Sequence, residues 1–250
     1  DSVERLEKLG VRVIGAPARF TGRNEVVGGG ISVRARRIVI AAGSAAVIPP
    51  VRGIDEIGAL TNETLFSLSR RPEHLLIVGG GPVGVEMAQA FRRLGSAVTL
   101  LQRGRLLPRD EPELVDMLRG RLASEGISIH QDAEITEISH GARGIVARYG
   151  SGGEVVGSHL LVAAGRQPRL AELALERAGV EYTSGGIRVD ARLRTTNRRV
   201  FALGDVIGAP QFTHAAGYQA GIVIRNALFR LPAKVDYRAL PWVTYCDPEL

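Results

Sequence analysis

The strongest hydrophobic pattern lies at residues 74–101, where two apolar runs flank a glycine-rich turn and an amphipathic segment. Residues 74–78 form a short continuous apolar run, which is typical of a buried strand. Residues 82–94 place apolar side chains at helical spacing, and residues 96–101 form a second apolar run. The pattern therefore predicts a strand, a helix and a second strand in this order.

The turn between the first strand and the helix carries the most specific motif in the chain. Gly79, Gly81 and Gly84 match the spacing G-x-G-x-x-G. In such a turn one glycine makes the tight bend, one lets the backbone approach a pyrophosphate, and one lets the helix pack closely on the strand. Pro82 suits the first helical turn, whose free N–H groups attract anions. The motif alone is weak evidence, but its place between a strand and a helix favours a nucleotide-phosphate site.

Before this unit, the pattern predicts a helix end, a short strand, a β meander, a buried strand and a short helix (residues 1–9, 11–14, 19–33, 36–44 and 62–69). The buried strand ends on the small residues Ala41-Ala42-Gly43-Ser44. Small residues there let a ligand contact the backbone, or equally let the chain pack closely on itself.

After the unit, the pattern predicts a helix, a strand, a second meander and a further strand (residues 111–125, 127–130, 134–158 and 160–166). The second meander replaces a crossover helix. Residues 160–166 repeat residues 38–44 almost in register, and each copy follows a meander and precedes a proline. We interpret this as an internal repeat of two nucleotide-binding units that end in the same way.

The last part of the chain is predicted to hold a strand pair, a helix and a final strand. The pair comprises residues 186–190 and 200–205, and the second strand ends in Gly204-Asp205. The Asp205 carboxylate could accept hydrogen bonds from ligand hydroxyls or could cap a turn. A helix is expected over residues 215–229. Residues 241–246 are expected to form a strand whose partners lie outside the chain.

Composition and charge narrow the function classes. The chain has 250 residues, 45% hydrophobic and 23% charged, which suits one large or two modest globular domains. The formal charge is +6, but only two residues are lysines and the arginines are scattered among carboxylates. No basic run is interleaved with aromatic residues, which argues against nucleic-acid binding. No apolar run reaches the roughly 18 residues that cross a bilayer, so no membrane partner is expected.

Cysteine usage and the chain ends add two expectations. Cys246 is the single cysteine, which excludes an internal disulfide and a cysteine-rich metal site. Such sparing use fits a reducing, cytoplasmic location, and no metal site is predicted. The chain begins at Asp1 within an amphipathic segment and stops abruptly at Leu250. We therefore expect a piece of a longer protein.

Four motifs together resemble those of the pyridine nucleotide–disulfide oxidoreductases, a family that includes dihydrolipoamide dehydrogenase, glutathione reductase and mercuric reductase. In chain order they are Ala41-Ala42-Gly43-Ser44, Gly79-Gly80-Gly81-Pro82-Val83-Gly84-Val85-Glu86, Ala164-Gly165-Arg166-Gln167-Pro168 and Phe201-Ala202-Leu203-Gly204-Asp205. The tail, residues 241–249, resembles the entry to that family's dimerisation domain. The resemblance covers essentially the whole chain.

The resemblance implies an α/β fold with FAD/NAD(P)-binding Rossmann-like domains of three layers (ββα). An NAD(P) domain, residues 67–186, would be inserted in a split FAD domain formed by residues 1–66 and 187–237. Residues 238–250 would begin a dimerisation domain, through which the intact protein would form a homodimer.

The resemblance also implies roles for individual residues. Those near FAD would be Ala42, Gly43, Ser44, Gly204, Asp205, Thr213 and His214, with Asp205 on the ribityl hydroxyls. Those at the NAD(P) pyrophosphate would be Gly79, Gly80, Gly81, Pro82, Val83 and Gly84. Glu86 would lie near the nicotinamide–flavin junction, with Gly165 at the nicotinamide end. Glu86 could instead be a first-turn charge that stabilises the helix. Pro82 stands where this family often has a bulky aromatic residue, so gating by a ring there is in doubt.

The choice between the two nicotinamide cofactors depends on the end of the second strand. A carboxylate there binds the ribose hydroxyls of NADH and repels a 2′-phosphate. This chain has Gln102, Arg103 and Arg105 there and no carboxylate. Arginine offers bidentate contacts to phosphate, which favours NADPH. The alternative is that these are solvated loop arginines.

The family's redox cysteine pair, its N-terminal FAD-phosphate motif and its C-terminal His-Glu pair are missing from these residues. No catalytic residue is therefore expected in the chain itself. The first hypothesis is part of an FAD enzyme that moves hydride from NAD(P)H to FAD and, in the intact protein, on to a disulfide, a dithiol-bound metal or a similar acceptor. An NAD(P)H oxidase or quinone-type flavoprotein without the cysteine pair and a non-catalytic nucleotide-binding module are the alternatives.

Overall fold

The computed structural model describes residues 2–208 and 210–250, so Asp1, with which the first expected FAD-domain segment begins, lies outside the described residues. The chain divides into two compact units. Unit 1 comprises Asp1–Ala45 and Gln167–Leu240, and unit 2 comprises Ala46–Arg166 and Pro241–Leu250. Among the described residues, no helix is both long enough and apolar enough to cross a bilayer.

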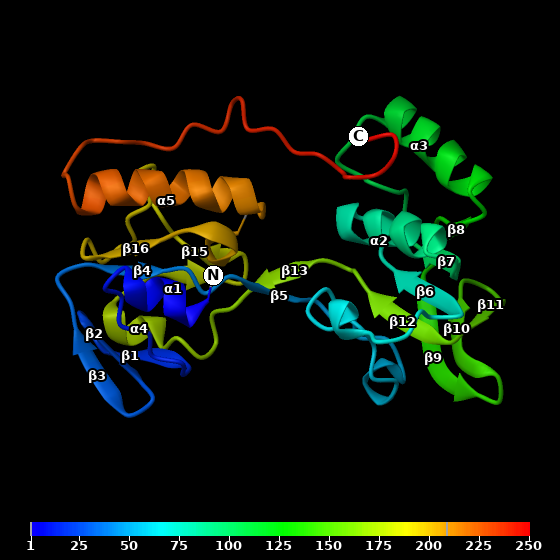
Figure 1. Cartoon of the computed structure of the whole chain (residues 1–250), viewed down its shortest axis with the longest axis horizontal. Helices are drawn as coiled ribbons and strands as arrows, with labels where there is room; N and C mark the ends of the chain where they lie inside the picture. The colour runs from blue at the N-terminus through cyan, green and yellow to red at the C-terminus, as the bar shows by residue number, and fades with distance from the viewer. Residues whose placement is uncertain (1, 209) are drawn as a thin grey trace. The chain divides into compact units, whose positions relative to one another are not determined.

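Unit 2 is built on a four-stranded parallel sheet (Figure 1). Its strand order is β12 (His159–Val162), β6 (His74–Val78), β7 (Ala97–Leu101) and β8 (Ser128–His130). Helices α2 (Pro82–Arg93) and α3 (Pro112–Ser124) follow β6 and β7. These elements confirm the strand, helix and strand that the hydrophobic pattern predicts.

Alternate residues of β6 serve the two faces of this sheet. Leu75 and Ile77 pack in one core with α2 and α3, and Leu76 and Val78 pack in a second core under an antiparallel meander. The meander comprises β9 (Ile135–Gly141), β10 (Gly144–Tyr149) and β11 (Gly153–Gly157) and leads into β12, so it is the crossover expected from the sequence. These four apolar side chains of β6 are at most 7% exposed. The burial of each stabilises the unit by roughly 1.5–3 kcal/mol. The result is a three-layer ββα arrangement.

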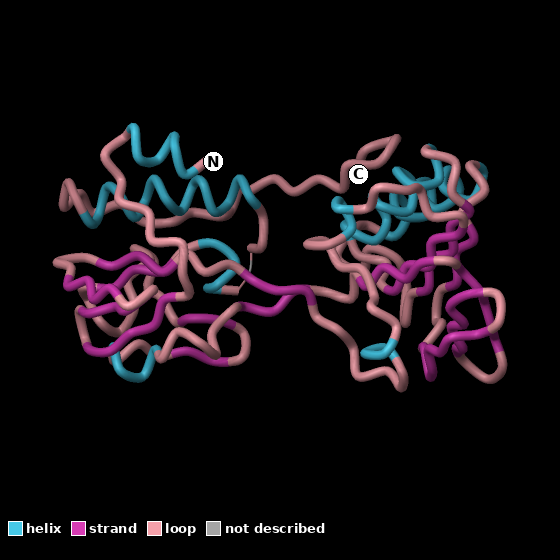
Figure 2. Tube along the Cα trace, turned by 60° about the horizontal axis from the view of Figure 1, so that its bottom comes forward, coloured by secondary structure: helices cyan, strands magenta, loops and turns pink. Residues whose placement is uncertain are grey.

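Unit 1 repeats this plan around a shorter parallel pair, β4 (Ile38–Ile40) with β16 (Val200–Ala202). A meander of β1 (Ala18–Gly22), β2 (Glu25–Gly28) and β3 (Ile31–Arg34) precedes β4. Val200 and Ala202 pack in a core with β1 and α4 (Leu175–Ala178), whereas Phe201 packs in another core with α5 (Thr213–Ala227). Strands and helices of this unit are coloured by type in Figure 2. Helix α1 (Val3–Lys8) confirms the expected first helix.

The backbone shows the same succession of elements in both copies of the repeat, while nucleotide binding by each copy stays a prediction. The strands β4 and β12 each lead to a glycine with positive φ, +69° at Gly43 and +125° at Gly165. The residues that follow form β5 (Ser44–Ala46) and β13 (Arg166–Pro168), and these two strands pair with each other. The N–H of Val47 donates to the Gly165 carbonyl at 3.0 Å, which continues this pairing. Two of the three points at which the chain passes from one unit to the other, 45/46 and 166/167, fall within these strands.

The unit limits fall at 45/46 and 166/167, while the sequence places domain limits at 66/67 and 186/187. Residues 46–66 belong to unit 2, and residues 167–186 belong to unit 1. Arg52 and Leu60 form isolated β-bridges to Glu137 and Leu161 in unit 2. The same segment contains the short 3₁₀ turns η1 (Ile54–Glu56) and η2 (Leu65–Ser67). Leu175 of α4 is buried in the core of unit 1. Which unit binds which nucleotide stays a prediction.

Three element predictions are wrong. Residues 11–14 form no strand, because Val11 is bound back to the Leu6 carbonyl and is 45% exposed. Residues 186–190 and 200–205 are not a pair: β15 (Gly186–Ile187) pairs with β14 (Tyr182–Thr183), and β16 pairs with β4. The helix expected at 62–69 is reduced to the single turn η2.

The tail prediction is also wrong. Residues 241–246 form no strand and instead lie against unit 2. Thr244 and Leu250 exchange backbone hydrogen bonds at 2.8 and 3.2 Å, which closes residues 244–250 into a loop. Cys246 in this loop is 7% exposed and belongs to the core shared by α2 and α3. A local pattern could not reveal that these residues find their partners in α2.

This burial predicts an unreactive thiol. Burial, aided by the charge of Glu86, raises the pKa of Cys246 to about 12. The thiolate is the reacting form, so labelling of native protein by a disulfide reagent at pH 8 should be roughly 100-fold slower than labelling in urea. Because Cys246 is the single cysteine, the released chromophore measures this site alone. Equal rates in native and unfolded protein would contradict the prediction.

Candidate functional site

The glycine turn of unit 2 is fixed by close approaches of backbone to backbone. Gly79 has φ of +113°, and a Cβ there would lie 2.3 Å from the Ala163 carbonyl oxygen beyond β12. A Cβ at Gly84 would lie 1.9 Å from the Gly79 carbonyl oxygen. The turn therefore packs on the end of β12, and α2 packs on the turn. Two of the three motif glycines are explained by packing within the chain.

The third motif glycine faces open space. A Cβ at Gly81 would meet no atom within 4 Å, and Gly81 is the N-cap of α2 with extended backbone. No side chain caps this helix end, and Pro82 occupies its first turn. The first-turn N–H groups of a helix are without partners in the helix and carry partial positive charge. An uncapped helix end over a glycine that leaves room is suited to a phosphate group.

The loop after β7 forms hydrogen bonds with the glycine turn. The Gly80 N–H donates to Gln102 Oε1 at 2.7 Å, and the Leu107 N–H donates to the Gly80 carbonyl at 2.9 Å. Gln102 Nε2 in turn donates to the Arg105 carbonyl at 3.2 Å. Gln102 therefore ties the loop to the turn, a role that the sequence did not reveal.

The two loop arginines differ in their surroundings. Arg105 donates to the carbonyls of Pro108 and Asp110 and so braces its own loop. Within the part of the chain that the structure describes, Arg103 makes one ion pair, with Glu134 at 3.3 Å, and both side chains are largely exposed. Exposed ion pairs are worth little, so the Arg103 guanidinium can exchange its partner for an anionic ligand.

Glu86 lies on α2 and is half-buried. Its Oε1 accepts the Tyr245 N–H at 2.9 Å, so the carboxylate contacts the tail loop. Val83 is 38% exposed at the start of the helix. Gly165, at the end of the repeat copy that follows β12, leaves open space where a Cβ would stand. Every residue expected at the NAD(P) site thus belongs to unit 2.

In unit 1, Ser44 and Asp205 meet although 161 positions separate them in the chain. Ser44 Oγ donates to Asp205 Oδ2 at 2.5 Å, and Ser44 is 5% exposed. They meet because β4 and β16 are parallel, so that the segments following both strands lie at the same edge. Gly43 leaves open space at this edge, and Ala42 packs against the core below it.

A buried glutamine supports this edge. The Gly204 N–H donates to Gln219 Oε1 at 2.6 Å, and Gln219 Nε2 donates to the Tyr237 hydroxyl at 2.9 Å. Gln219 is fully buried on α5, and burial also raises the pKa of Tyr237. The sequence analysis missed Gln219, for which the only signal is a polar residue on the apolar face of the predicted helix.

The start of α5 completes the residues expected in unit 1. Phe212 is its N-cap without a side-chain cap, and Thr213 begins the helix. The His214 ring stacks on Phe212 with centroids 5.3 Å apart. Thr213 and His214 are exposed. Across residues 2–208 and 210–250, no group of three or more His, Cys, Asp or Glu side chains could hold a metal ion.

Comparison with known proteins agrees with this geometry. A family model described as pyridine nucleotide-disulphide oxidoreductase matches residues 2–220. Mercuric reductase of Streptomyces lividans is 42% identical over 227 residues, which are 89% of this chain and 48% of that protein. Dihydrolipoyl dehydrogenase of Bacillus subtilis is 30% identical over 251 residues, 98% of this chain and 55% of that protein. The chain spans about half the length of the curated relatives that it matches.

Solved structures give the same result. The HOCl-induced flavoprotein disulfide reductase RclA from Escherichia coli superposes with a TM-score of 0.89 at 32% identity. That superposition covers 95% of this chain and 56% of the other. LpdA from Mycobacterium tuberculosis gives a TM-score of 0.87 at 25% identity and covers 98% of this chain and 56% of the other.

The space around each glycine predicts opposite effects for two glycine-to-alanine substitutions, one in α2 beside the glycine turn and one in α3. Gly84→Ala should destabilise the chain by about 3 kcal/mol, because its methyl group must displace backbone at Gly79. Gly120→Ala lies within α3, where a Cβ meets nothing within 4 Å, and should stabilise by about 0.5–1 kcal/mol. Urea unfolding followed by circular dichroism measures both. A neutral Gly84→Ala would show that α2 does not depend on this close approach.

Proposed function

We propose that this chain, which belongs to the pyridine nucleotide-disulphide oxidoreductase family, binds FAD through unit 1 and NADPH through unit 2 and serves hydride transfer from NADPH to FAD. The observation that carries the proposal is the repetition of one site plan. Each unit has small residues at the carboxyl edge of its parallel strands and a helix whose first turn has no side-chain cap. Nucleotides bind at such edges in open α/β sheets.

In unit 2, the N–H groups at the start of α2 and the open space at Gly81 would hold the pyrophosphate. Arg103 would bind the 2′-phosphate, since the loop after β7 offers no carboxylate between Gln102 and Arg105. Gly79, Gly80 and Gly84 shape this turn, with Pro82 and Val83 in the first helical turn. Glu86 and Gly165 would lie at the nicotinamide end.

In unit 1, Asp205 would accept hydrogen bonds from the ribityl hydroxyls, oriented by Ser44. Gln219 holds the Gly204 peptide, so the turn before Asp205 is rigid. Ala42 and Gly43 would let FAD approach the backbone, and the start of α5 at Thr213 and His214 would face the flavin ring. Bound FAD supplies the hydride acceptor, while these residues position it and exclude water.

The onward acceptor is proposed to be a disulfide, a dithiol-bound metal or a similar group in the intact protein. Cys246 is the single cysteine in these residues and is buried, so it forms no disulfide within the chain. From the family we further expect a cytoplasmic homodimer.

FAD retention tests the assignment of unit 1. Asp205→Ala should lower FAD affinity at least tenfold, because a charge-assisted hydrogen bond to the ribityl chain is lost. The visible absorbance of flavin after gel filtration, with calorimetric titration of FAD, measures the effect. Glu176→Ala, an exposed change on α4 in the same unit, is the control and should leave affinity unchanged. Equal affinity in both variants would remove Asp205 from the site.

Cofactor choice tests the assignment of Arg103. Arg103→Ala should lower the ratio of NADPH to NADH affinity about tenfold, because only NADPH carries the 2′-phosphate. Titration calorimetry with both cofactors gives the ratio. The control is Arg119→Ala, which removes an equally charged exposed side chain from α3. An unchanged ratio would show that Arg103 is a solvated loop residue.

A further inference from the structure

The tail loop 244–250 is bound to α2 by specific hydrogen bonds. Gln89 is 4% exposed, and its carboxamide pairs with Asp247 in both directions. Gln89 Oε1 accepts the Asp247 N–H at 2.8 Å, and Gln89 Nε2 donates to the Asp247 carbonyl at 2.9 Å. Thr244 and Cys246, on the same loop, are 1% and 7% exposed. The loop is therefore packed into unit 2.

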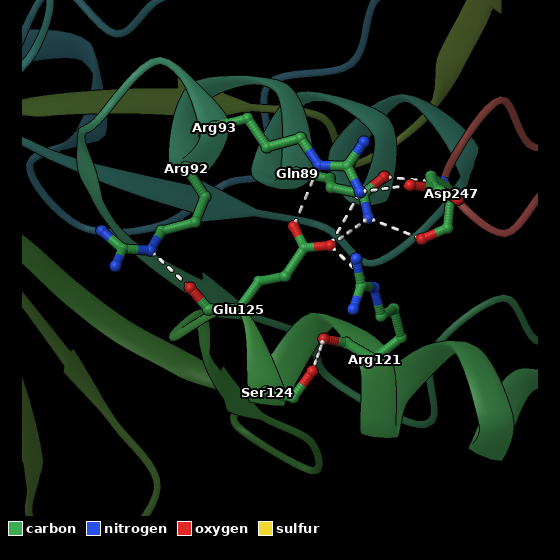
Figure 3. Close-up of polar contacts among 7 residues, drawn as sticks. All are labelled: Gln89, Arg92, Arg93, Arg121, Ser124, Glu125 and Asp247. Carbon is green, nitrogen blue, oxygen red and sulfur yellow. Dashed lines mark hydrogen bonds and ion pairs between the residues drawn. The ribbon is translucent and has the colours of Figure 1, made fainter.

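Charged residues of both helices reinforce this contact (Figure 3). Arg93 of α2 binds Asp247 at 2.7 Å and Glu125 at 2.8 Å, and Arg121 of α3 binds Glu125 at 2.9 Å. The Arg93 hydrogen bond holds the pKa of Glu125 below its usual range. One network of ion pairs thus joins the loop to α2 and α3.

One backbone N–H of the loop contacts Glu86, the residue expected at the nicotinamide end of the site. The Tyr245 N–H donates to Glu86 Oε1 at 2.9 Å, while the Tyr245 side chain is 69% exposed. Among the described residues, Glu86 accepts a side-chain hydrogen bond at Oε1 and none at Oε2. A carboxylate with one oxygen held by a backbone donor has a fixed plane, and its second oxygen can still accept a ligand N–H.

We propose that loop 244–250 positions Glu86 for the nicotinamide end of NADPH, with the Tyr245 N–H fixing the carboxylate and Gln89 and Asp247 keeping the loop docked. This inference rests on the proposed function, which puts Glu86 at that end. Docking removes the rotational freedom of the Glu86 side chain before the ligand binds, so less entropy is lost on binding. The carboxamide of the reduced nicotinamide is the group whose N–H donors would use Oε2.

A pair of substitutions at one position tests the backbone donor. Tyr245→Pro removes the N–H, and Tyr245→Ala retains it while removing the side chain. Affinity of the whole 250-residue chain is measured by calorimetry for two ligands, NADPH and adenosine 2′,5′-bisphosphate. The second ligand carries the phosphates of the adenosine half and no nicotinamide. Tyr245→Pro should bind NADPH about tenfold more weakly than Tyr245→Ala, and both should bind the bisphosphate equally.

Controls separate positioning from folding. Glu249→Gln changes an exposed residue of the same loop and should bind both ligands like the unsubstituted chain. In a Glu86→Ala background, Tyr245→Pro should have no further effect on NADPH affinity. Gln89→Leu undocks the loop by a different route and should show the same loss for NADPH alone. The labelling rate of Cys246 reports docking in each variant.

Two results would overturn the inference while the proposed function stands. One is equal loss of affinity for both ligands in Tyr245→Pro and Gln89→Leu, which would make the loop a general support of the fold. The other is unchanged NADPH affinity in a variant whose Cys246 labels rapidly. If the unsubstituted chain binds neither ligand, the nucleotide site of unit 2 is itself wrong, and both proposals fail together.

Discussion

The close approach of α2 to the turn that precedes it is the constraint on which unit 2 depends. A Cβ at Gly84 would lie 1.9 Å from the Gly79 carbonyl oxygen, so the helix begins directly against the turn. That placement brings the uncapped helix start to the carboxyl edge of β6 and β12. The proposed anion site at this edge would thus follow from how the backbone packs, before any charged side chain is considered.

Local pattern predicted most of the elements because their determinants are local. The runs at β6 and β7, the helix periodicity of α2 and α3, and the meander before β12 all appear where expected. The repeat of residues 38–44 in 160–166 corresponds to two strands, β4 and β12, that each lead to a glycine with positive φ. Comparison with relatives confirms the family that the four motifs indicated.

Two of the failures share one cause, which is that the deciding partner lies far away in the chain. β16 pairs with β4, and the paired residues Val200 and Ile38 are 162 positions apart in the chain. The expected partner of β16 was the nearby segment 186–190. The tail residues appear strand-like because they are apolar, yet Cys246 and Thr244 are buried against α2 and its neighbours. Nothing within ten residues of either segment distinguishes these outcomes. Each expected set of site residues falls within one unit, and their binding roles stay predictions.

In each unit a glutamine side chain restricts the motion of a glycine turn by accepting a glycine N–H. Gly80 and Gly204 each donate their N–H to a glutamine oxygen, from Gln102 at 2.7 Å and from Gln219 at 2.6 Å. Glycine loses more conformational entropy on ordering than any other residue, and such a bond fixes its peptide plane within the fold. Each glutamine then uses its NH₂ group on a second partner, the Arg105 carbonyl or the Tyr237 hydroxyl, so its own orientation is set as well. The two units therefore share a physical solution as well as a sequence repeat. In each unit, a glutamine amide whose orientation is fixed by a second hydrogen bond holds a glycine peptide in place.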